Sequence, residues 1–207
     1  APGRSWTVDL ADLEGIEAFA ERVLNDLGGL DVVINNAGAS RRRLMQAITV
    51  DEFDTTMALN FESPMRLTLA LLPHLLEQGS GHIVNVPSMG TRSAARNVGA
   101  YVAAKAALNA FTEALYLDLV GTGVQAHLFV PGTTATEFST PREGNDPPFP
   151  QPPGSAMDPA DVADALLACL GTTHWESFAS EDHQRVATRK RADPNSFLAR
   201  MVEHFEG

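Results

Sequence analysis

Short apolar runs alternate along the chain with longer stretches in which apolar residues recur at helical spacing. Apolar or β-branched runs bounded by turn residues are typical of buried strands, whereas apolar positions repeating every three or four residues predict helices. We predict strands at residues 5–10, 31–35, 82–86 and 124–130, and helices at residues 13–27, 51–77 (interrupted by Pro64) and 99–121. This alternation favours a parallel sheet covered by helices on both faces.

A long segment rich in proline and glycine follows the last predicted strand and covers residues 131–157. It contains Asp-Pro-Pro-Phe-Pro-Gln-Pro-Pro-Gly, so we predict a flexible loop, with a disordered linker as the alternative. A helix is predicted to begin at Asp158-Pro159, because aspartate caps a helix start and proline fits the first turn.

Ser88, Tyr101 and Lys105 form the candidate chemistry of the chain. Tyr101 and Lys105 lie four residues apart in a predicted helix, which places both side chains on one face. A free tyrosine titrates near pH ~10, so a phenolate at neutral pH needs roughly 3 to 4 kcal/mol of favourable field, and the lysine ammonium is one source. With Ser88 bonding a substrate oxygen, Tyr101 can act as general acid or base toward a carbinol or carbonyl group.

Composition limits the classes of partner. The 207 residues are 44% hydrophobic and 20% charged, as expected for one globular domain spanning residues 1–207. A formal charge of −11 disfavours nucleic acid and anionic membranes as partners, and no apolar run is long enough to cross a bilayer. Arg41-Arg42-Arg43 is the one cationic cluster; we interpret it as a solvated loop, with an anionic-substrate contact as the alternative.

Cysteine and histidine usage adds two expectations. Cys169 is the only cysteine, which excludes an internal disulfide and favours a reducing compartment, so we expect a cytoplasmic protein. The six histidines show no metal-ligand spacing, and we predict no metal site.

The motifs resemble those of the short-chain dehydrogenase/reductase family. Tyr101-Val-Ala-Ala-Lys105 with Ser88 matches the family's catalytic residues, and Asn35-Asn36-Ala37-Gly38 matches its Asn-Asn-Ala-Gly segment after the fourth strand. Asn60, in Leu-Asn-Phe-Glu-Ser, is similar to the asparagine that in the family holds a water linking the catalytic lysine to solvent. Pro131-Gly132 resembles the segment that meets the nicotinamide carboxamide.

The resemblance implies a set of site residues and a cofactor. The implied catalytic residues are Asn60, Ser88, Tyr101 and Lys105. The implied cofactor-binding residues are Asp9, Leu10, Asn36, Ala37, Gly38, Tyr101, Lys105, Pro131, Gly132, Thr134 and Thr136. The cofactor is NAD or NADP without a readable preference, its positive nicotinamide would add to the field on Tyr101, and the substrate is a small alcohol or carbonyl compound.

One family feature has no match: the chain contains no glycine-rich phosphate-binding loop. The implied fold class is therefore α/β, a Rossmann-like three-layer parallel sheet truncated at its N-terminus, with the family's first two strands and helices absent. We expect the strand at residues 31–35 to lose its cover, unless the strand at residues 5–10 docks directly beside it.

Two hypotheses for function follow. The first is an NAD(P)-dependent oxidoreductase that interconverts a secondary alcohol and a ketone, and the alternative is a truncated, non-catalytic homologue that serves as a binding or assembly subunit. The helix at residues 99–121 is apolar on more than one side, which predicts either a homodimer or homotetramer contact, as in the family, or burial beneath the C-terminal segment.

Overall fold

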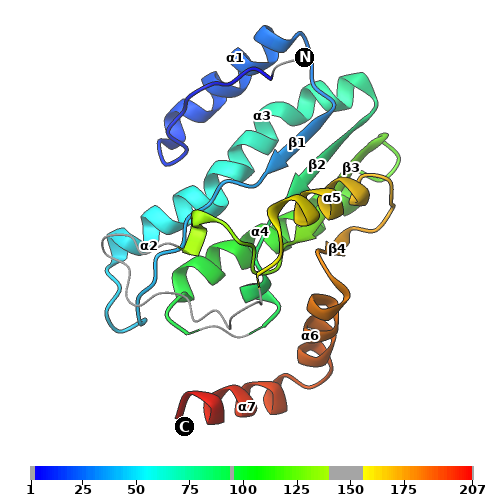
Figure 1. Cartoon of the computed structure of the whole chain (residues 1–207). Helices are drawn as coiled ribbons and strands as arrows, with labels where there is room; N and C mark the ends of the chain where they lie inside the picture. Colours follow the sequence, from blue (N-terminus) through cyan, green and yellow to red (C-terminus); the bar gives the residue numbers. More distant parts are fainter. Residues whose placement is uncertain (1–2, 94–95, 140–155, 207) are drawn as a thin grey trace.

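A four-stranded parallel sheet forms the centre of the computed structural model, which describes residues 3–93, 96–139 and 156–206 (Figure 1). Its strands lie side by side in the order β1 (Val32–Asn35), β2 (Gly81–Asn85), β3 (Val124–Val130) and β4 (Glu176–Phe178). Every neighbouring pair is parallel. Three predicted strands are confirmed to within one residue at each end, whereas β4 is too short to produce a readable pattern.

Helices connect these strands. They are α1 (Ile16–Leu27), α2 (Val50–Met57), α3 (Ser63–Gln78), α4 (Gly99–Asp118), α5 (Pro159–Cys169), α6 (Glu181–Ala192) and α7 (Pro194–Glu206), with short turns η1 (Leu13–Gly15), η3 (Met89–Thr91) and η4 (Glu137–Ser139). Those up to α5 follow the predicted order, whereas α6 and α7 were not predicted. The predicted start of α5 is confirmed, because Asp158 Oδ1 accepts a hydrogen bond from Ala160 N at 2.8 Å.

The predicted break at Pro64 takes a different form. Residues Ala58–Glu62 form a π-helical turn, η2, between α2 and α3, so the backbone remains helical and the irregularity precedes the proline. Pro64 follows directly in the first turn of α3 and has no backbone N–H to donate to the carbonyls of η2. A π-turn inside a helix is a frequent feature of functional sites.

The sheet is covered by helices on both faces, which confirms the three-layer α/β class. On one face, Ala20 of α1 and Leu75 of α3 pack with Ile83 and Ala126 of the sheet. On the other face, Val84 and Phe129 pack with Cys169 and its neighbours on α5. Figure 1 shows α6 and α7 continuing beyond the sheet from β4.

The prediction of a strand at residues 5–10 is wrong. The segment is extended, but it forms no sheet pairing, and its half-buried positions lie along α1. Trp6 Nε1 donates to Asp26 Oδ2 at 2.6 Å, and Arg22 donates to the carbonyl of Thr7 at 3.3 Å. The side chains of this segment do alternate between half-buried and exposed, but the half-buried ones pack on helix α1 and not on the sheet. The segment therefore does not pair with β1.

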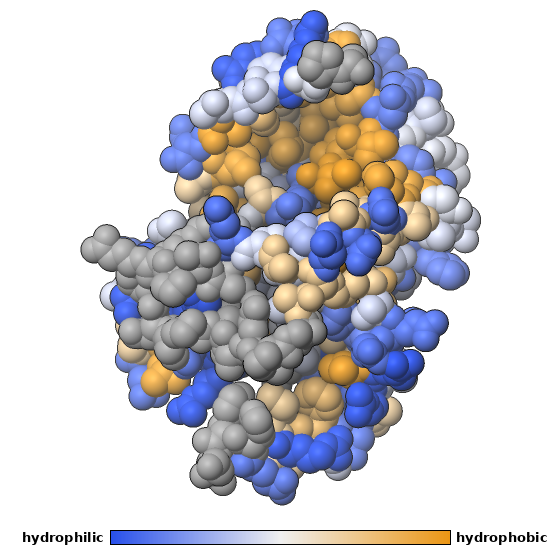
Figure 2. Space-filling model, in the orientation of Figure 1, coloured by the Kyte–Doolittle hydropathy of each residue, from blue (hydrophilic) through white to orange (hydrophobic). Residues whose placement is uncertain are grey.

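The outer strand β1 is consequently covered on one face only. Val33, on the face toward α3, is 7% exposed, whereas Val32 and Ile34, on the opposite face, are 38% and 43% exposed. Figure 2 shows apolar residues gathered on this side of the molecule. In the described part of the chain, no helix is both long and apolar enough to cross a bilayer.

Candidate functional site

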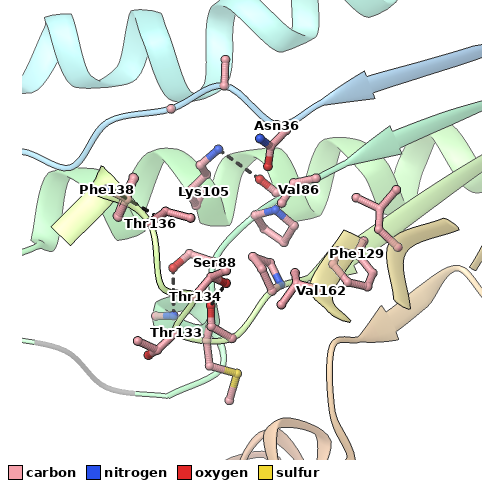
Figure 3. Close-up of a pocket in the computed structure, with 18 of the residues that line it drawn as sticks. Asn36, Val86, Ser88, Lys105, Phe129, Thr133, Thr134, Thr136, Phe138 and Val162 are labelled. Atoms are coloured by element: carbon pink, nitrogen blue, oxygen red, sulfur yellow. Dashed lines mark hydrogen bonds between the residues drawn. The ribbon is translucent and has the colours of Figure 1, made fainter. Parts of the chain in front are cut away.

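Three loops meet at the carboxyl ends of the strands and line a cavity of about 820 Å³. They are the segments Asn36–Gly38 after β1, Pro87–Gly90 after β2 and Pro131–Thr134 after β3, and α4 and α5 supply further walls. The carboxyl edge of a parallel sheet is where open α/β folds bind ligands. Figure 3 shows side chains from these separate segments converging on the cavity.

Lys105 lies at the inner end of this cavity and is 2% exposed. Its Nζ donates to the carbonyl of Val86 at 3.1 Å, a bond drawn in Figure 3. Burial lowers the pKa of Lys105 to about 8, so the ammonium form still dominates at neutral pH. A Cβ at Gly38 would lie 3.3 Å from Lys105 Nζ and 2.7 Å from Asn60 Oδ1, so only glycine permits this approach.

Tyr101 and Ser88 lie on neighbouring walls. The Ser88 hydroxyl accepts a hydrogen bond from Gly90 N at 3.1 Å, and the Ser88 side chain also interacts with the Tyr101 phenol. Burial raises the pKa of Tyr101 to about 12, and the Ser88 contact opposes that rise. Desolvation thus outweighs the Ser88 contact. The expectation that Lys105 and a positive nicotinamide together favour the phenolate stays a prediction.

Asn60 lies in the π-turn and is completely buried. Its amide donates to the carbonyls of Ala39 at 3.0 Å and Thr56 at 2.9 Å, while its oxygen accepts from Ala39 N at 3.2 Å. These bonds fasten the loop after β1 to the helical layer. Asn60 and Lys105 thus approach the same glycine, Gly38, from different elements.

A buried chain of polar side chains, not anticipated from the sequence, supports this edge of the sheet. Asn35 Nδ2 donates to Asn85 Oδ1 at 2.8 Å and to Thr68 Oγ1 at 3.0 Å, and Asn85 Nδ2 donates to Thr112 Oγ1 at 2.9 Å. This hydrogen-bond network links the ends of β1 and β2 to α3 and α4. A sequence signal was available, since both asparagines occupy inward-facing strand positions that apolar residues normally fill.

Most of the predicted cofactor-binding residues line the cavity. The lining includes Asn36, Ala37, Gly38, Tyr101, Lys105, Pro131, Gly132, Thr134 and Thr136. Asp9 and Leu10 are not among the described lining residues, and Asp9 Oδ1 accepts instead from Ala11 N at 2.9 Å. Residues 140–155 of the predicted loop lie outside the described residues.

Two further points correct the sequence-based picture. Phe138, which sequence reasoning missed, places its ring 5.8 Å from that of Tyr101 at the cavity wall. The arginine cluster is not a solvated loop: Arg42 is buried, and Arg41 and Arg43 form ion pairs with Glu52 at 3.5 and 3.3 Å.

Comparison with known proteins identifies the family to which the chain belongs. Residues 3–146 match the family model described as short chain dehydrogenase. The chain belongs to the short-chain dehydrogenase family. Its sheet and flanking helices have the Rossmann-like arrangement of that family.

Individual family members give the extent of the likeness. An uncharacterised oxidoreductase of Mycobacterium tuberculosis is 41% identical over 122 residues, which cover 58% of this chain and 36% of that protein. A fatty acyl-CoA reductase of the same organism is 38% identical over 145 residues, covering 69% of this chain and 49% of the reductase. The chain thus spans about a third to a half of these relatives.

A solved structure supports the same arrangement. A short-chain dehydrogenase from Burkholderia cenocepacia, crystallised in complex with NADP, superposes with a TM-score of 0.78 at 26% identity, covering 94% of this chain and 76% of that one.

The residues present fit one end of such a cofactor. Gly38 leaves open the space above Lys105 Nζ, a buried donor, as a nicotinamide ribose would need. Gly132 and Thr134 line the cavity from the β3 side, where their backbone groups can meet a carboxamide.

Proposed function

We propose that this protein is an NAD- or NADP-dependent oxidoreductase that interconverts a secondary alcohol and a ketone. The observation that carries the proposal is the meeting of Ser88, Tyr101 and Lys105, from β2's loop and α4, at one cavity that Asn36–Gly38 and Pro131–Thr136 also line. A proton donor, a hydroxyl and a buried ammonium around one space are the groups that carbonyl reduction requires.

Each side chain has a distinct proposed role. The cofactor, when bound, supplies or accepts the hydride. Tyr101 gives its proton to the carbonyl oxygen during reduction, and a phenol with a pKa of about 12 is protonated at neutral pH and ready to donate. Ser88 donates a hydrogen bond to the same substrate oxygen, and Lys105 holds the ribose and stabilises the negative charge left on the Tyr101 oxygen after proton transfer.

Oxidation of an alcohol places the opposite demand on Tyr101. The phenol must then act as a base, which a pKa of about 12 disfavours at neutral pH. A positive charge beside the phenol lowers its pKa, and the nicotinamide of the oxidised cofactor would supply one when bound. We therefore expect kcat/KM for oxidation to increase with pH, while the acid function of Tyr101 in reduction persists through neutral pH.

Remaining site assignments extend the proposal. Asn60 supports Lys105 and Gly38 from the π-turn, and Thr134 and Thr136 complete the nicotinamide end of the site. Asp9 and Leu10 stay predicted contacts for the adenine end. The substrate side of the described cavity is lined by Met89, Val98, Val102 and Phe138, which favours a substrate whose carbonyl carries apolar groups.

A homodimer or homotetramer in the cytoplasm is part of the same proposal. Ala103, Ala106, Ala110 and Leu117 form an exposed stripe on α4, and no described C-terminal element covers it. Burial beneath the C-terminal segment is thus the less supported explanation. Light scattering coupled to size exclusion should give at least twice the monomer mass, and Ala110→Glu should reduce it; a monomer at micromolar concentration would contradict the oligomer.

A binding or assembly subunit is the second candidate, and the open β1 strand favours it. Exposed Val32 and Ile34 adjoin an unpaired strand edge in the described structure, a surface suited to another chain. The two candidates differ in whether the cavity binds a nicotinamide.

One experiment separates them. NADH and NADPH are titrated into the protein while reduced-nicotinamide fluorescence is recorded, and a panel of apolar ketones is then added. The oxidoreductase proposal predicts saturable binding and ketone-dependent oxidation of the cofactor. A folded protein, verified by circular dichroism, that gives no saturable signal would overturn it and favour the second candidate.

A further inference from the structure

Helix α6 contacts two of the segments that line the cavity. His183 packs so closely against Gly132 that a Cβ at that position would overlap the imidazole ring. Ser180, which caps α6, lies 2.8 Å from His183 Nδ1 and fixes the ring in place. At its other end, α6 sends Lys190 Nζ to the carbonyl of Ser93, a cavity-lining residue, at 2.6 Å.

An ion-pair network strengthens the second contact. Glu176, at the start of β4, accepts from Arg92 Nε at 2.8 Å and from Arg191 Nη2 at 2.7 Å. The Arg92 and Glu176 side chains are only 12% and 8% exposed, whereas Arg191 is largely exposed. The carboxylate of β4 therefore joins α6 to the loop that follows Ser88.

Arg92 continues the connection toward the acid-base residues. It belongs to the short turn that Ser88 opens: the Ser88 carbonyl accepts from Thr91 N at 3.0 Å, and Arg92 N donates to Met89 O at 2.9 Å. With the amide of Asn109 oriented to match its neighbours, its oxygen accepts from Arg92 Nη1 at 2.7 Å and its nitrogen donates to Lys105 O at 3.2 Å. One guanidinium thus bridges β4, the Ser88 turn and the Lys105 turn of α4.

Burial gives these contacts a positioning role. A buried ion pair adds little net stability, because desolvation of two charges offsets their attraction, yet its fixed geometry can specify one arrangement. The planar guanidinium of Arg92 has bonding partners on three sides, so the turn carrying Ser88 has little freedom. The Ser88 hydroxyl must reach Tyr101 from that turn.

We propose that Arg92, Glu176 and Arg191 form a positioning network through which α6 holds the Ser88 turn against Tyr101. The network sets the distance between the serine hydroxyl and the phenol, and with His183 on Gly132 it makes α6 the common support of both cavity-lining segments. This inference rests on the proposed function for its kinetic consequences, but its structural consequence is measurable without catalysis.

The test uses the full chain with Glu176→Gln and Arg191→Gln, and Arg189→Gln as the matched control, since Arg189 is an exposed arginine on the same helix. If Glu176→Gln fails to fold, Arg191→Gln still tests the network, because Arg191 is exposed and its substitution should not prevent folding. Ketone reduction should show kcat lowered roughly tenfold to a hundredfold for Glu176→Gln and by a smaller factor for Arg191→Gln. Cofactor Kd should stay within about twofold, and Arg191→Lys should restore part of kcat.

A spectroscopic measurement gives an independent result. The chain has two tyrosines, so a Tyr116→Phe background leaves Tyr101 as the single tyrosine signal. With ¹³Cζ-labelled tyrosine, Glu176→Gln and Arg191→Gln should shift the resonance toward its position in Ser88→Ala, whereas Arg189→Gln should not. An unmoved resonance, or unchanged kcat with only a lower melting temperature, would overturn the network. If the unaltered protein shows no turnover, the proposed function fails and the resonance alone decides the network.

Discussion

The two faces of the sheet are built differently, and β1 shows the contrast within a single strand. Val33 is buried beneath α1 and α3, whereas its neighbours Val32 and Ile34 point to the other face and remain open. α5 covers that second face over β2 and β3 only, through Val84 and Phe129. The candidate acid-base residues Tyr101 and Lys105 belong to α4, on the well-covered side.

The contrast teaches that the chemistry and the exposed surface are separable. Lys105 is surrounded by elements of the covered side. These are the hydrogen-bond network of buried asparagines and threonines, the π-turn and α4 itself. Substitutions on the covered face should therefore lower stability, whereas matched substitutions on the open face of β1 should leave stability nearly unchanged.

The largest effect on stability should come from one substitution made on both faces. Ile83 is fully buried on the covered face, and Ile34 is exposed on the other. Ile83→Ala should lower the free energy of unfolding by about 2 to 5 kcal/mol, because it leaves a cavity, whereas Ile34→Ala should change it by less than about 0.5 kcal/mol. Urea denaturation measures both, and equal losses would show that another chain or segment covers the second face in solution.

Lys105→Met should separate stability from activity on the covered side. Burial lowers the pKa of Lys105 to about 8, so keeping it charged at pH 7 costs up to about 3 kcal/mol. Because the folded-state pKa is depressed, that cost exists below the unfolded pKa and is greatest below the folded one. The variant should lose ketone reduction yet unfold at equal or higher urea concentration; full activity would contradict the role of Lys105.

A smaller, pH-dependent effect should come from the histidine pair that lies on the side of the sheet with Phe129. Burial and neighbouring His82 lower the pKa of His127, and the two rings meet with Nδ1 of His82 3.0 Å from Nε2 of His127. A depressed histidine pKa means that the unfolded chain binds the proton more readily, so stability present above pH ~6.5 should decrease below it. His127→Gln should flatten the thermal-midpoint profile between pH 5 and 7, and an unchanged profile would assign the effect to other groups such as His183.

Sequence reasoning identified the strands of the sheet core because their apolar runs are continuous and bounded by turns. It also anticipated much of the cavity lining, since Asn36–Gly38, Ser88 and Pro131–Gly132 follow strands whose carboxyl ends meet. It failed at residues 5–10, because an alternating pattern shows that one side of an extended segment is buried but not whether a helix or a strand covers that side. β4 was missed because its three residues carry no periodic signal.

The sequence predicted which residues line the site better than it predicted their pKa values and long-range contacts. The spacing of Tyr101 and Lys105 gave their common helix, but the pKa of each depends on burial, which the structure supplies. Likewise, the link from Arg191 to Arg92 joins residues far apart in the chain through a carboxylate on a third element. No local sequence pattern predicts the contact of Arg92 and Arg191 with the same carboxylate.

The acid-base assignment of Tyr101 is tested most directly by comparing the chain's two tyrosines. Tyr116 bonds the carbonyl of Thr173 at 3.3 Å and lies outside the cavity, so Tyr116→Phe is the matched control for Tyr101→Phe. We predict that kcat for NAD(P)H-dependent ketone reduction falls by about 10²- to 10⁴-fold in Tyr101→Phe, with cofactor affinity retained, and stays within about twofold in Tyr116→Phe. Equal activity in the two variants would contradict the account.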